Sequence, residues 1–365
     1  MTTPRVLFVA RTRYELPLPA PVARKWEALA EQMELRVLAT AAREPSSDGR
    51  FTLLEDRPLA AFYAVLPMHV AREVSAFEPD VVVVQSPYEA AAAKAGLALA
   101  RSRARILLEV HGDWETATML YGSPARRALE PVSRRIARAA VRSADAVRTV
   151  SPFTSDLVRA AGGEPTATFT TYFDVGAFTG PLAPLPEAPS ALFVGVLERY
   201  KNVAGLAAAW RLASPRLPGA TLSLVGAGRE TVLVQELVDE LPHSTKWTPR
   251  LAPAEVAAAL DTASLLVLPS FSEGLPRVAI EAFARGRPVV GARAGGIPDI
   301  VEDGVNGLLV DPHDPESIAE GLVRALGDRA LLERLAAGAA ASSSRWLQSP
   351  ELFALRMRAL VDGLR

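Results

Sequence analysis

Short runs of apolar residues alternate with longer amphipathic stretches along the first half of the chain. The runs are RVLFVA (5–10), LRVLAT (35–40), DVVVVQS (80–86), ARILLEVHG (104–112) and DAVRTVS (145–151). Apolar runs without polar alternation are typical of strands that are buried on both faces, and helix-length segments between them favour parallel pairing. The first half therefore predicts a parallel sheet with helices on both faces.

The same pattern restarts after a segment rich in proline and alanine. That segment, TGPLAPLPEAPS (179–190), cannot continue a helix or a central strand and is interpreted as a linker. The later apolar runs are ALFVGV (191–196), ATLSLVG (220–226), SLLVLPS (264–270), PVVGAR (288–293) and GLLVD (307–311). The pattern predicts an α/β protein of two Rossmann-like, doubly wound domains. In such sheets ligands bind beyond the carboxyl ends of the strands, so we expect the active site in a cleft that the two domains face.

The domain boundaries follow from the linker and from the end of the chain. We assign residues 1–180 to an N-terminal, acceptor-side domain and residues 181–345 to a C-terminal, donor-binding domain. In the tail, 346–365, apolar residues with helical spacing follow a Ser-Pro break, which suits a helix start. We expect this helix to pack back across the N-terminal domain.

Composition excludes several classes of function. The formal net charge of −1 argues against bulk binding of nucleic acid, which requires a strongly basic balance. The chain has no cysteine, so disulfides, thiolate metal sites and a cysteine nucleophile are excluded. The apolar run before Arg11 and Arg13 is too short for a signal peptide or a membrane span. The sequence predicts a soluble, cytoplasmic protein.

Within PSFSEGLPRVAIEAFARG (269–286), Glu281 is the one charged residue in the strongly apolar stretch from Val278 to Ala284. A helix built from this run would be buried on nearly all sides. Because an unpaired, desolvated carboxylate costs several kcal/mol or takes up a proton, Glu281 needs a strong partner. A nearby arginine or a pair of vicinal sugar hydroxyls of a ligand would each satisfy it.

Two loops near this helix carry groups that suit a phosphate. In SEGLP (272–276), Pro276 suits the first helical turn, which would leave the amides of Gly274 and Leu275 at the helix N-terminus, with Glu273 at its mouth. In GVLERYKN (195–202), Arg199 and Lys201 follow a strand end, where two cations are well placed for a diphosphate. Taken alone, Arg199 and Lys201 are more often interpreted as solvated loop charges.

Glycines mark two further turns. Gly195 and Gly226, the second in LVGAGRE (224–230), permit close approach of a backbone at strand ends. Such turns are ordinary features of α/β folds. Gly295 and Gly296 could likewise form only a helix-entry turn.

Taken together, these motifs resemble the retaining GT-B glycosyltransferases of family 4. The resemblance rests on FVGVLERYKN, LVGAGRE and the long segment EGLPRVAIEAFARGRPVVGARAGGIPDIVEDGVNGLLVDPHDPESIAEGL, and it is dense over 190–345. It implies a UDP- or GDP-sugar donor. Glu273 would approach the donor sugar, Glu281 the ribose, and Arg199 with Lys201 the diphosphate.

The chain departs from the family pattern at several positions. The arginine usual after the first glycine is Val196 here, so Arg199 is a candidate substitute. By the resemblance, Trp247 and Thr248 fall where the family contacts the base, although an apolar strand end explains them as well. His111 in EVHGDW would contact the donor sugar. The family's glycine-rich loop after its first strand is missing, so acceptor recognition must differ.

The implied reaction is transfer of a hexosyl unit with retention, in glycan, glycolipid or polysaccharide biosynthesis. The chain contains no D-x-D motif, so we expect no metal requirement. Glu273 and Glu281 do not suggest the two flanking carboxylates of a glycosidase. A nucleotide-sugar epimerase of similar shape and a catalytically silent, nucleotide-binding homologue remain as alternatives.

A basic stretch marks the acceptor-side domain. SPARRALEPVSRRIARAAVRSAD (123–145) contains six arginines between Arg126 and Arg142 and a single glutamate, Glu130. A charge run is usually a solvated face, yet a basic amphipathic stretch is also typical of contact with an anionic membrane surface. The acceptor is therefore either lipid-linked, at the inner face of the membrane, or soluble.

Overall fold

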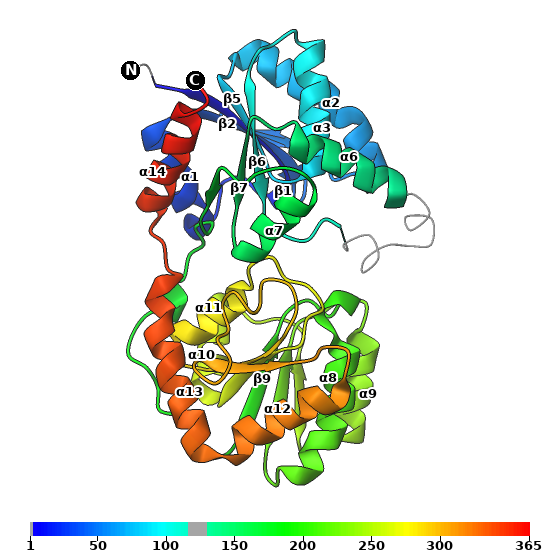
Figure 1. Ribbon diagram of the computed structural model, residues 1–365, viewed down its shortest axis with the longest axis vertical. Helices are drawn as coiled ribbons and strands as arrows, with labels where there is room; N and C mark the ends of the chain where they lie inside the picture. Colours follow the sequence, from blue (N-terminus) through cyan, green and yellow to red (C-terminus); the bar gives the residue numbers. More distant parts are fainter. Residues whose placement is uncertain (1–2, 116–129) are drawn as a thin grey trace. The chain divides into compact units, whose positions relative to one another are not determined.

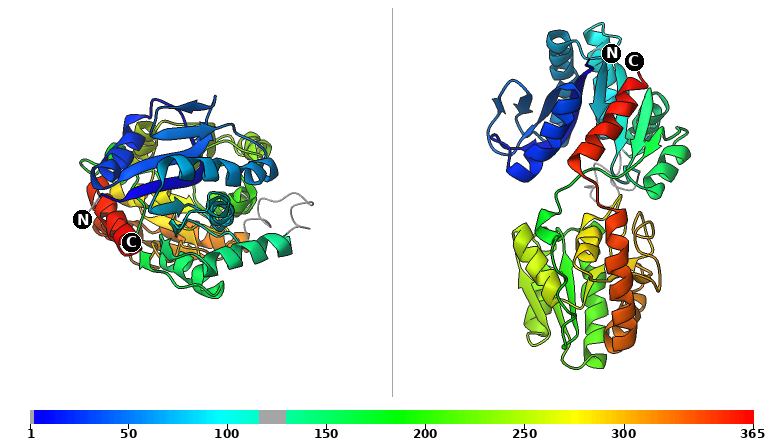
Figure 2. Two further views of the ribbon diagram at one scale, coloured as in Figure 1. Left: turned by 90° about the horizontal axis from the view of Figure 1, so that it is seen from above. Right: turned by 90° about the vertical axis from the view of Figure 1, so that its left-hand side faces the viewer.

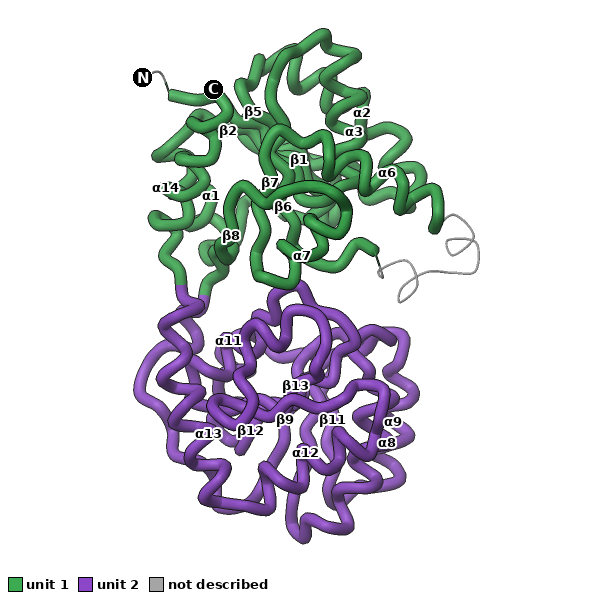
Figure 3. Tube along the Cα trace, viewed as in Figure 1, with its two compact units in different colours: residues 1–174, 348–365 green, residues 175–347 purple. Residues whose placement is uncertain are grey.

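The computed structural model describes residues 3–115 and 130–365. The chain divides into two compact units, the first made of Met1–Asp174 with Gln348–Arg365 and the second of Val175–Leu347 (Figure 3). Each unit is a parallel sheet between helices (Figure 1). The predicted α/β class with two doubly wound sheets is confirmed.

The first unit contains an eight-stranded sheet in the order β3-β4-β2-β1-β5-β6-β7-β8. Its strands are β1 (Arg5–Tyr14), β2 (Glu34–Ala41), β3 (Ser46–Ser47), β4 (Phe51–Leu54), β5 (Val81–Val84), β6 (Arg105–Val110), β7 (Ala146–Thr149) and β8 (Ala167–Thr168). Every pair is parallel except β3 with β4. The direction of winding reverses between β1 and β5, which makes this the switch point of the sheet.

Six described helices cover this sheet. They are α1 (Ala20–Gln32), α2 (Leu59–Phe77), α3 (Pro87–Leu99), α6 (Glu130–Arg142), α7 (Pro152–Ala160) and α14 (Pro350–Asp362). Because side chains alternate along β1, Val6 and Phe8 join one core and Leu7 and Val9 the other. Phe353 of α14 belongs to the first of these cores, and α14 lies beside α1 in both Figure 1 and Figure 2.

Strand β1 is longer than the sequence predicted, because it continues past the apolar run 5–10 to Tyr14. Its pairing with β2 shifts register between Val9 and Arg13. The outer part of the strand is held by aromatic contacts of Tyr14 with Trp26 and Phe51. Arg11 and Thr12 therefore lie on a strand rather than in a loop.

The second unit contains a six-stranded parallel sheet in the order β11-β10-β9-β12-β13-β14. Its strands are β9 (Ser190–Val194), β10 (Thr221–Val225), β11 (Thr245–Thr248), β12 (Leu265–Leu268), β13 (Val289–Ala292) and β14 (Gly307–Val310). Its helices are α8 (Val203–Ala213), α9 (Thr231–Glu240), α10 (Pro253–Thr262), α11 (Arg277–Ala284), α12 (Pro315–Gly327) and α13 (Arg329–Ser342). The switch point lies between β9 and β12.

In the described residues four short 3-10 turns join these elements, and the segment predicted as a linker is hydrogen-bonded to the rest of the second unit. The turns are η1 (Gly176–Phe178), η2 (Arg199–Lys201), η3 (Ser214–Arg216) and η4 (Ser343–Arg345). Arg285 donates to the carbonyl of Pro181, and Arg287 donates to the carbonyls of Ala183 and Pro184. Arginines can hold this segment because its proline-rich backbone offers carbonyls that no sheet or helix uses.

Within the described residues, no helix combines the length and the apolar character that a bilayer crossing requires.

Candidate functional site

The loops that follow β9 and β12 meet at the switch point of the second unit. The backbone amide of Phe271 donates to the carbonyl of Tyr200 at 2.8 Å, which joins the two loops. Asn202 strengthens the junction, because its Nδ2 donates to the carbonyls of Pro269 and Pro312 while its Oδ1 caps α8. Sequence reasoning missed Asn202. Asn202 has a left-handed backbone with a φ of 57°, a conformation that the sequence pattern does not reveal.

Lys201 and Glu273 form an ion pair across this junction. The Lys201 Nζ lies 2.5 Å from the Glu273 Oε1, and the two side chains are 11% and 13% exposed. The sequence assigned one residue to a diphosphate and the other to a sugar, and the structure brings them together. The side chain of Arg199 is exposed and makes no hydrogen bond or ion pair with any described residue.

Glu281 lies at the edge of the buried face of α11. Ala279, Ile280, Ala282 and Phe283 are buried, whereas Glu281 itself is only half-buried, so the expectation of burial on nearly all sides is wrong. Burial raises the pKa of its carboxyl group, and the charge of Arg277 lowers that pKa in part. The carboxylate of Glu281 has neither a hydrogen bond nor an ion pair in the part of the chain that the structure describes.

The N-terminus of α11 lies one residue later than the sequence predicted. The helix begins at Arg277, and Pro276 is its N-cap residue rather than part of the first turn. Gly274 and Leu275 therefore precede the helix. The cause is the extended backbone of Pro276, which has a ψ of 97°.

A pair of glycines after β13, Gly295 and Gly296, packs against the loop that contains Glu273 and Gly274. The amide of Gly296 donates to the carbonyl of Glu273 at 2.7 Å. A Cβ atom at Gly295 would lie 2.6 Å from the Glu273 nitrogen, and one at Gly296 would lie 2.2 Å from the Gly274 oxygen. A larger residue at Gly295 would have to move the backbone of Glu273, and one at Gly296 would have to move the backbone of Gly274. The sequence signal was the double glycine, which was interpreted only as a possible helix-entry turn.

Gly195, Gly226, Trp247 and Thr248 lie together at the ends of β9, β10 and β11. A Cβ atom at Gly226 would lie 1.8 Å from the Gly195 oxygen, so close packing of backbones requires glycine there. The Trp247 indole N–H donates to the Gly226 carbonyl at 2.8 Å. The indole N–H of Trp247 is therefore already used in a hydrogen bond within the protein. Thr248 is exposed.

His111 directly follows β6 in the first unit, as the sequence predicted for a strand end. Its Nε2 lies 3.5 Å from Glu109 Oε2, and its Nδ1 lies 3.4 Å from Thr171 Oγ1. Burial lowers the pKa of the imidazole, and the nearby Glu109 carboxylate opposes this shift. Asp113, two residues after His111, accepts a hydrogen bond from the amide of Glu115.

Behind His111, Glu109 and Arg148 form a buried ion pair with a shortest distance of 2.8 Å. Burial alone would raise the pKa of Glu109, but Arg148 and His111 outweigh burial and hold that pKa well below its usual range. Arg148 also donates to Phe169 and Thr171. The pair fixes the strand ends that carry His111.

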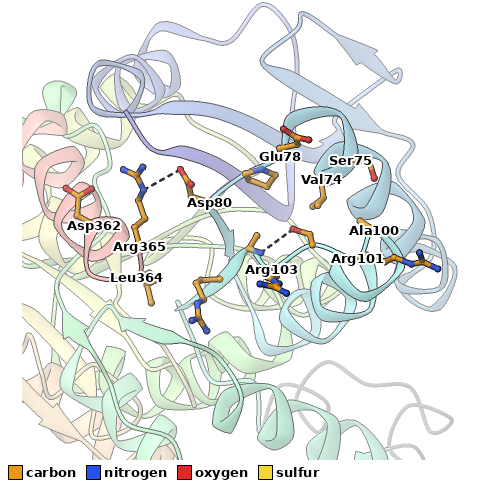
Figure 4. A pocket seen from close by; sticks show the side chains of 14 residues that line it. Val74, Ser75, Glu78, Asp80, Ala100, Arg101, Arg103, Asp362, Leu364 and Arg365 are labelled. Carbon is orange, nitrogen blue, oxygen red and sulfur yellow. Dashed lines mark hydrogen bonds and ion pairs between the residues drawn. The ribbon is translucent and has the colours of Figure 1, made fainter. Parts of the chain in front are cut away.

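A hollow of about 1000 Å³ in the first unit lies at the opposite edge of the sheet (Figure 4). Its lining includes Asp80 and Arg105, which precede or begin β5 and β6. Arg365 pairs with Asp80, and Arg105 pairs with Asp145. Because parallel sheets hold ligands beyond the carboxyl ends of their strands, this hollow is not the candidate site.

The basic stretch of the first unit is described only from Glu130 onward. Arg126 and Arg127 lie outside the described residues. Arg134 pairs with Glu130, and Arg138 pairs with Glu115. Other side chains of α6 form its exposed face, which combines apolar and basic residues, namely Val132, Arg135, Ile136 and Arg142.

Two family models match the chain. The model described as Glycosyltransferase Family 4 matches residues 23–169, and the model described as Glycosyl transferases group 1 matches residues 188–328. Each match falls within one of the two compact units.

Curated relatives and solved structures extend the comparison. A D-inositol 3-phosphate glycosyltransferase of a Nocardioides species is 36% identical over 171 residues, which are 44% of this chain and 36% of that relative. The chain thus spans about a third of the length of this curated relative. Sucrose-phosphate synthase of Thermosynechococcus elongatus superposes with a TM-score of 0.79 at 21% identity, over 100% of this chain and 99% of that one. HepE of Anabaena, solved in complex with UDP and glucose, superposes with a TM-score of 0.72 at 19% identity, over 98% and 100%.

Proposed function

Because both halves of the chain belong to glycosyltransferase families and fold as in GT-B glycosyltransferases, we propose that the protein is a retaining hexosyltransferase. It moves a sugar from a UDP- or GDP-sugar to an acceptor without a metal ion. The observation that carries the donor site is Glu281, a half-buried carboxylate that makes no hydrogen bond or ion pair with a described residue, on the helix that follows the loop of the Lys201–Glu273 pair. The HepE complex with UDP and glucose supports a nucleotide-sugar donor.

The residues at the switch point have distinct roles in this proposal. Glu281 accepts hydrogen bonds from the two ribose hydroxyls. Lys201, Arg199 and the amides of Gly274 and Leu275 stabilise the departing diphosphate, while Glu273 approaches the hydroxyls of the donor sugar. His111, which follows β6, is also assigned a contact with the donor sugar in this proposal.

The bond changes need no nucleophile of the enzyme. The acceptor oxygen bonds to the anomeric carbon on the face from which the nucleotide leaves, and the bond between that carbon and the phosphate oxygen breaks. The acceptor's proton passes to the leaving phosphate. The protein contributes positioning and electrostatic stabilisation.

Glu281→Ala should weaken the binding of bare UDP or GDP about 10- to 100-fold. Hydrogen bonds to a charged group contribute about 1.5–3 kcal/mol, and the alanine removes them. Calorimetry and thermal shift measure this directly, since a ligand at 100 times its Kd stabilises a protein by about 2.7 kcal/mol. Because burial raises the pKa of Glu281, wild-type affinity should also fall at acidic pH, where the carboxylate takes up a proton.

Glu236→Ala is the matched control for this experiment. Glu236 is an exposed carboxylate on α9, and its removal should leave nucleotide affinity unchanged. If neither UDP, GDP nor their sugars shift the melting temperature of the wild-type protein, the transferase proposal is wrong.

Two alternatives predict other products. A nucleotide-sugar epimerase would release an epimer of the donor sugar, whereas a transferase releases free nucleotide with the sugar on water or an acceptor. A catalytically silent homologue would bind the nucleotide sugar and release neither an epimer nor free nucleotide. Chromatography of the donor after incubation separates the three.

The exposed face of α6 is the basis for proposing a membrane-borne, lipid-linked acceptor. We expect the protein to sediment with vesicles that contain anionic lipid, and this binding should fade as salt screens the arginines. The variant Arg135→Glu with Arg142→Glu should lose most of the binding. The variant Arg101→Glu with Arg103→Glu, at exposed sites elsewhere in the same unit, should retain it. Absence of binding at low salt would favour a soluble acceptor.

A further inference from the structure

A pocket of about 420 Å³ lies in the first unit, lined by Arg11, Thr12, Gln85, Glu89 and His111. Arg11 and Thr12 lie on β1 beyond its pairing with β5, which ends at Val9. Gln85 directly follows β5. The pocket therefore lies at the carboxyl ends of β1, β5 and β6, at the switch point of this sheet, where α/β folds bind ligands.

Two side chains that line this pocket present buried polar atoms without hydrogen-bond partners among the described residues. These atoms are Arg11 Nε and Glu89 Oε2. Buried polar atoms are normally paired, so two in the lining of one pocket indicate a missing polar partner. A ligand that both donates and accepts hydrogen bonds would satisfy both.

Glu89 is the more informative of the two residues. It lies in the first turn of α3 and is 4% exposed. Its Oε1 accepts a hydrogen bond from the Tyr63 hydroxyl at 3.1 Å, while its Oε2 has no such bond. Burial raises the pKa of this carboxyl group, which nearby backbone amides, Tyr63 and Arg11 offset in part. The group thus resists ionisation and can donate as well as accept.

The charges around the pocket disfavour an anion. Arg11 is the single cation among the lining side chains apart from His111, whose pKa is lowered by burial. The Arg11 guanidinium already donates to the carbonyl of Arg57 at 3.1 Å and lies 3.7 Å from Asp56. The other lining groups include Thr12 and Gln85, which hydrogen-bond each other at 2.9 Å and are neutral. A phosphate would meet one compensated cation and the carboxyl group of Glu89.

We propose that this pocket binds an uncharged, polyhydroxylated group of the acceptor, such as a sugar or cyclitol ring without phosphate, and that Glu89 determines this specificity. The inference rests on the transferase activity proposed above. Vicinal hydroxyls donate to Glu89 Oε2 and accept from Arg11 Nε, so the ring satisfies atoms that the fold leaves unpaired. The missing glycine-rich loop fits this assignment, because Arg11 and Thr12 extend β1 into its place.

The test compares two acceptors that differ by one phosphate. The full chain is incubated with the nucleotide sugar that shifts its melting temperature, and with either myo-inositol or D-inositol 3-phosphate. Release of nucleotide measures donor turnover, and mass spectrometry measures the glycoside. We expect myo-inositol to accept sugar with a kcat/KM at least tenfold above that of the phosphate.

Variants at residue 89 separate recognition from folding. Glu89→Leu should raise the KM for myo-inositol at least tenfold, whereas hydrolysis of the donor and the nucleotide thermal shift stay within twofold. The glutamine of Glu89→Gln can still donate and accept hydrogen bonds, so the KM for myo-inositol should stay close to the wild-type value. Tyr63→Phe combined with Glu89→Leu leaves no unpaired hydroxyl and provides a second apolar variant if Glu89→Leu is unstable. Glu44→Leu, at an exposed carboxylate outside the pocket, is the matched control.

Each other outcome is decisive. Preference for the phosphorylated acceptor, or an unchanged KM in Glu89→Leu, would overturn the inference. Hydrolysis of the donor that neither acceptor intercepts would also overturn it and leave the transferase proposal in place. If the donor is neither bound nor hydrolysed, the transferase proposal itself fails.

Discussion

Replacing Glu273 with glutamine should lower the rate of sugar transfer about 100- to 1000-fold, the loss typical for removal of one group that stabilises a transition state. The affinity for bare UDP or GDP should stay the same or increase. The reason is the ion pair of Glu273 with Lys201. Glutamine is nearly isosteric but uncharged, so it releases Lys201 to interact with the diphosphate.

Single-turnover kinetics and calorimetry with bare nucleotide measure the two effects separately. Lys201→Met should weaken nucleotide binding, and Glu236→Gln should change neither quantity. If Glu273→Gln weakened nucleotide binding as much as Glu281→Ala does, the two glutamates would not have the separate targets proposed for them.

Arg148→Leu should lower the free energy of unfolding of the first unit by about 3–5 kcal/mol, because it leaves Glu109 as an unpaired buried charge. The Arg148 and Glu109 side chains are 0% and 2% exposed, and the guanidinium also lies over the rings of Phe169 and Phe353. Urea denaturation, followed by hydrogen exchange in peptides from β6 and β7, measures the loss.

Arg105→Leu is the matched control, because it breaks an ion pair between the same two strands. Arg105 begins β6, and its partner Asp145 directly precedes β7. Arg105 is 60% exposed, so this change should cost less than about 1 kcal/mol. Glu109→Leu combined with Arg148→Leu should recover much of the lost stability, because both buried charges are gone. Equal effects of Arg148→Leu and Arg105→Leu would contradict the role of burial.

The Glu109–Arg148 contribution should not change between pH 5 and pH 8. The pKa of Glu109 is held below its usual range, so the stabilisation is fully present above the unfolded pKa of about 4 and is lost only as the pH falls toward the folded value. Glu281 behaves in the opposite way. Its raised pKa means that its charge opposes folding at neutral pH and that this penalty disappears in acid.

The sequence alone determined the two parallel sheets, because each apolar run records the burial of a strand on both faces. The central strands β5, β6, β10 and β12 fall within the predicted runs, and β9 begins one residue before its run. It missed β4, and it gave β11 only as a possible strand end, since short strands at or near sheet edges lack a continuous apolar run. It also singled out Glu281, because a carboxylate within an apolar helical pattern can be recognised from the sequence without knowledge of the fold.

Only the tertiary structure decided which residues meet. Lys201 and Glu273 are 72 positions apart and pair because β9 and β12 are neighbours at the switch point. Gly295 and Gly296 press against the Glu273 loop because β13 lies next to β12. Glu89 looks like an ordinary acidic residue in a helical first turn. Its burial beside Arg11 and His111 follows from the adjacency of β1, β5 and β6, which is a property of strand order and is not encoded in any local pattern.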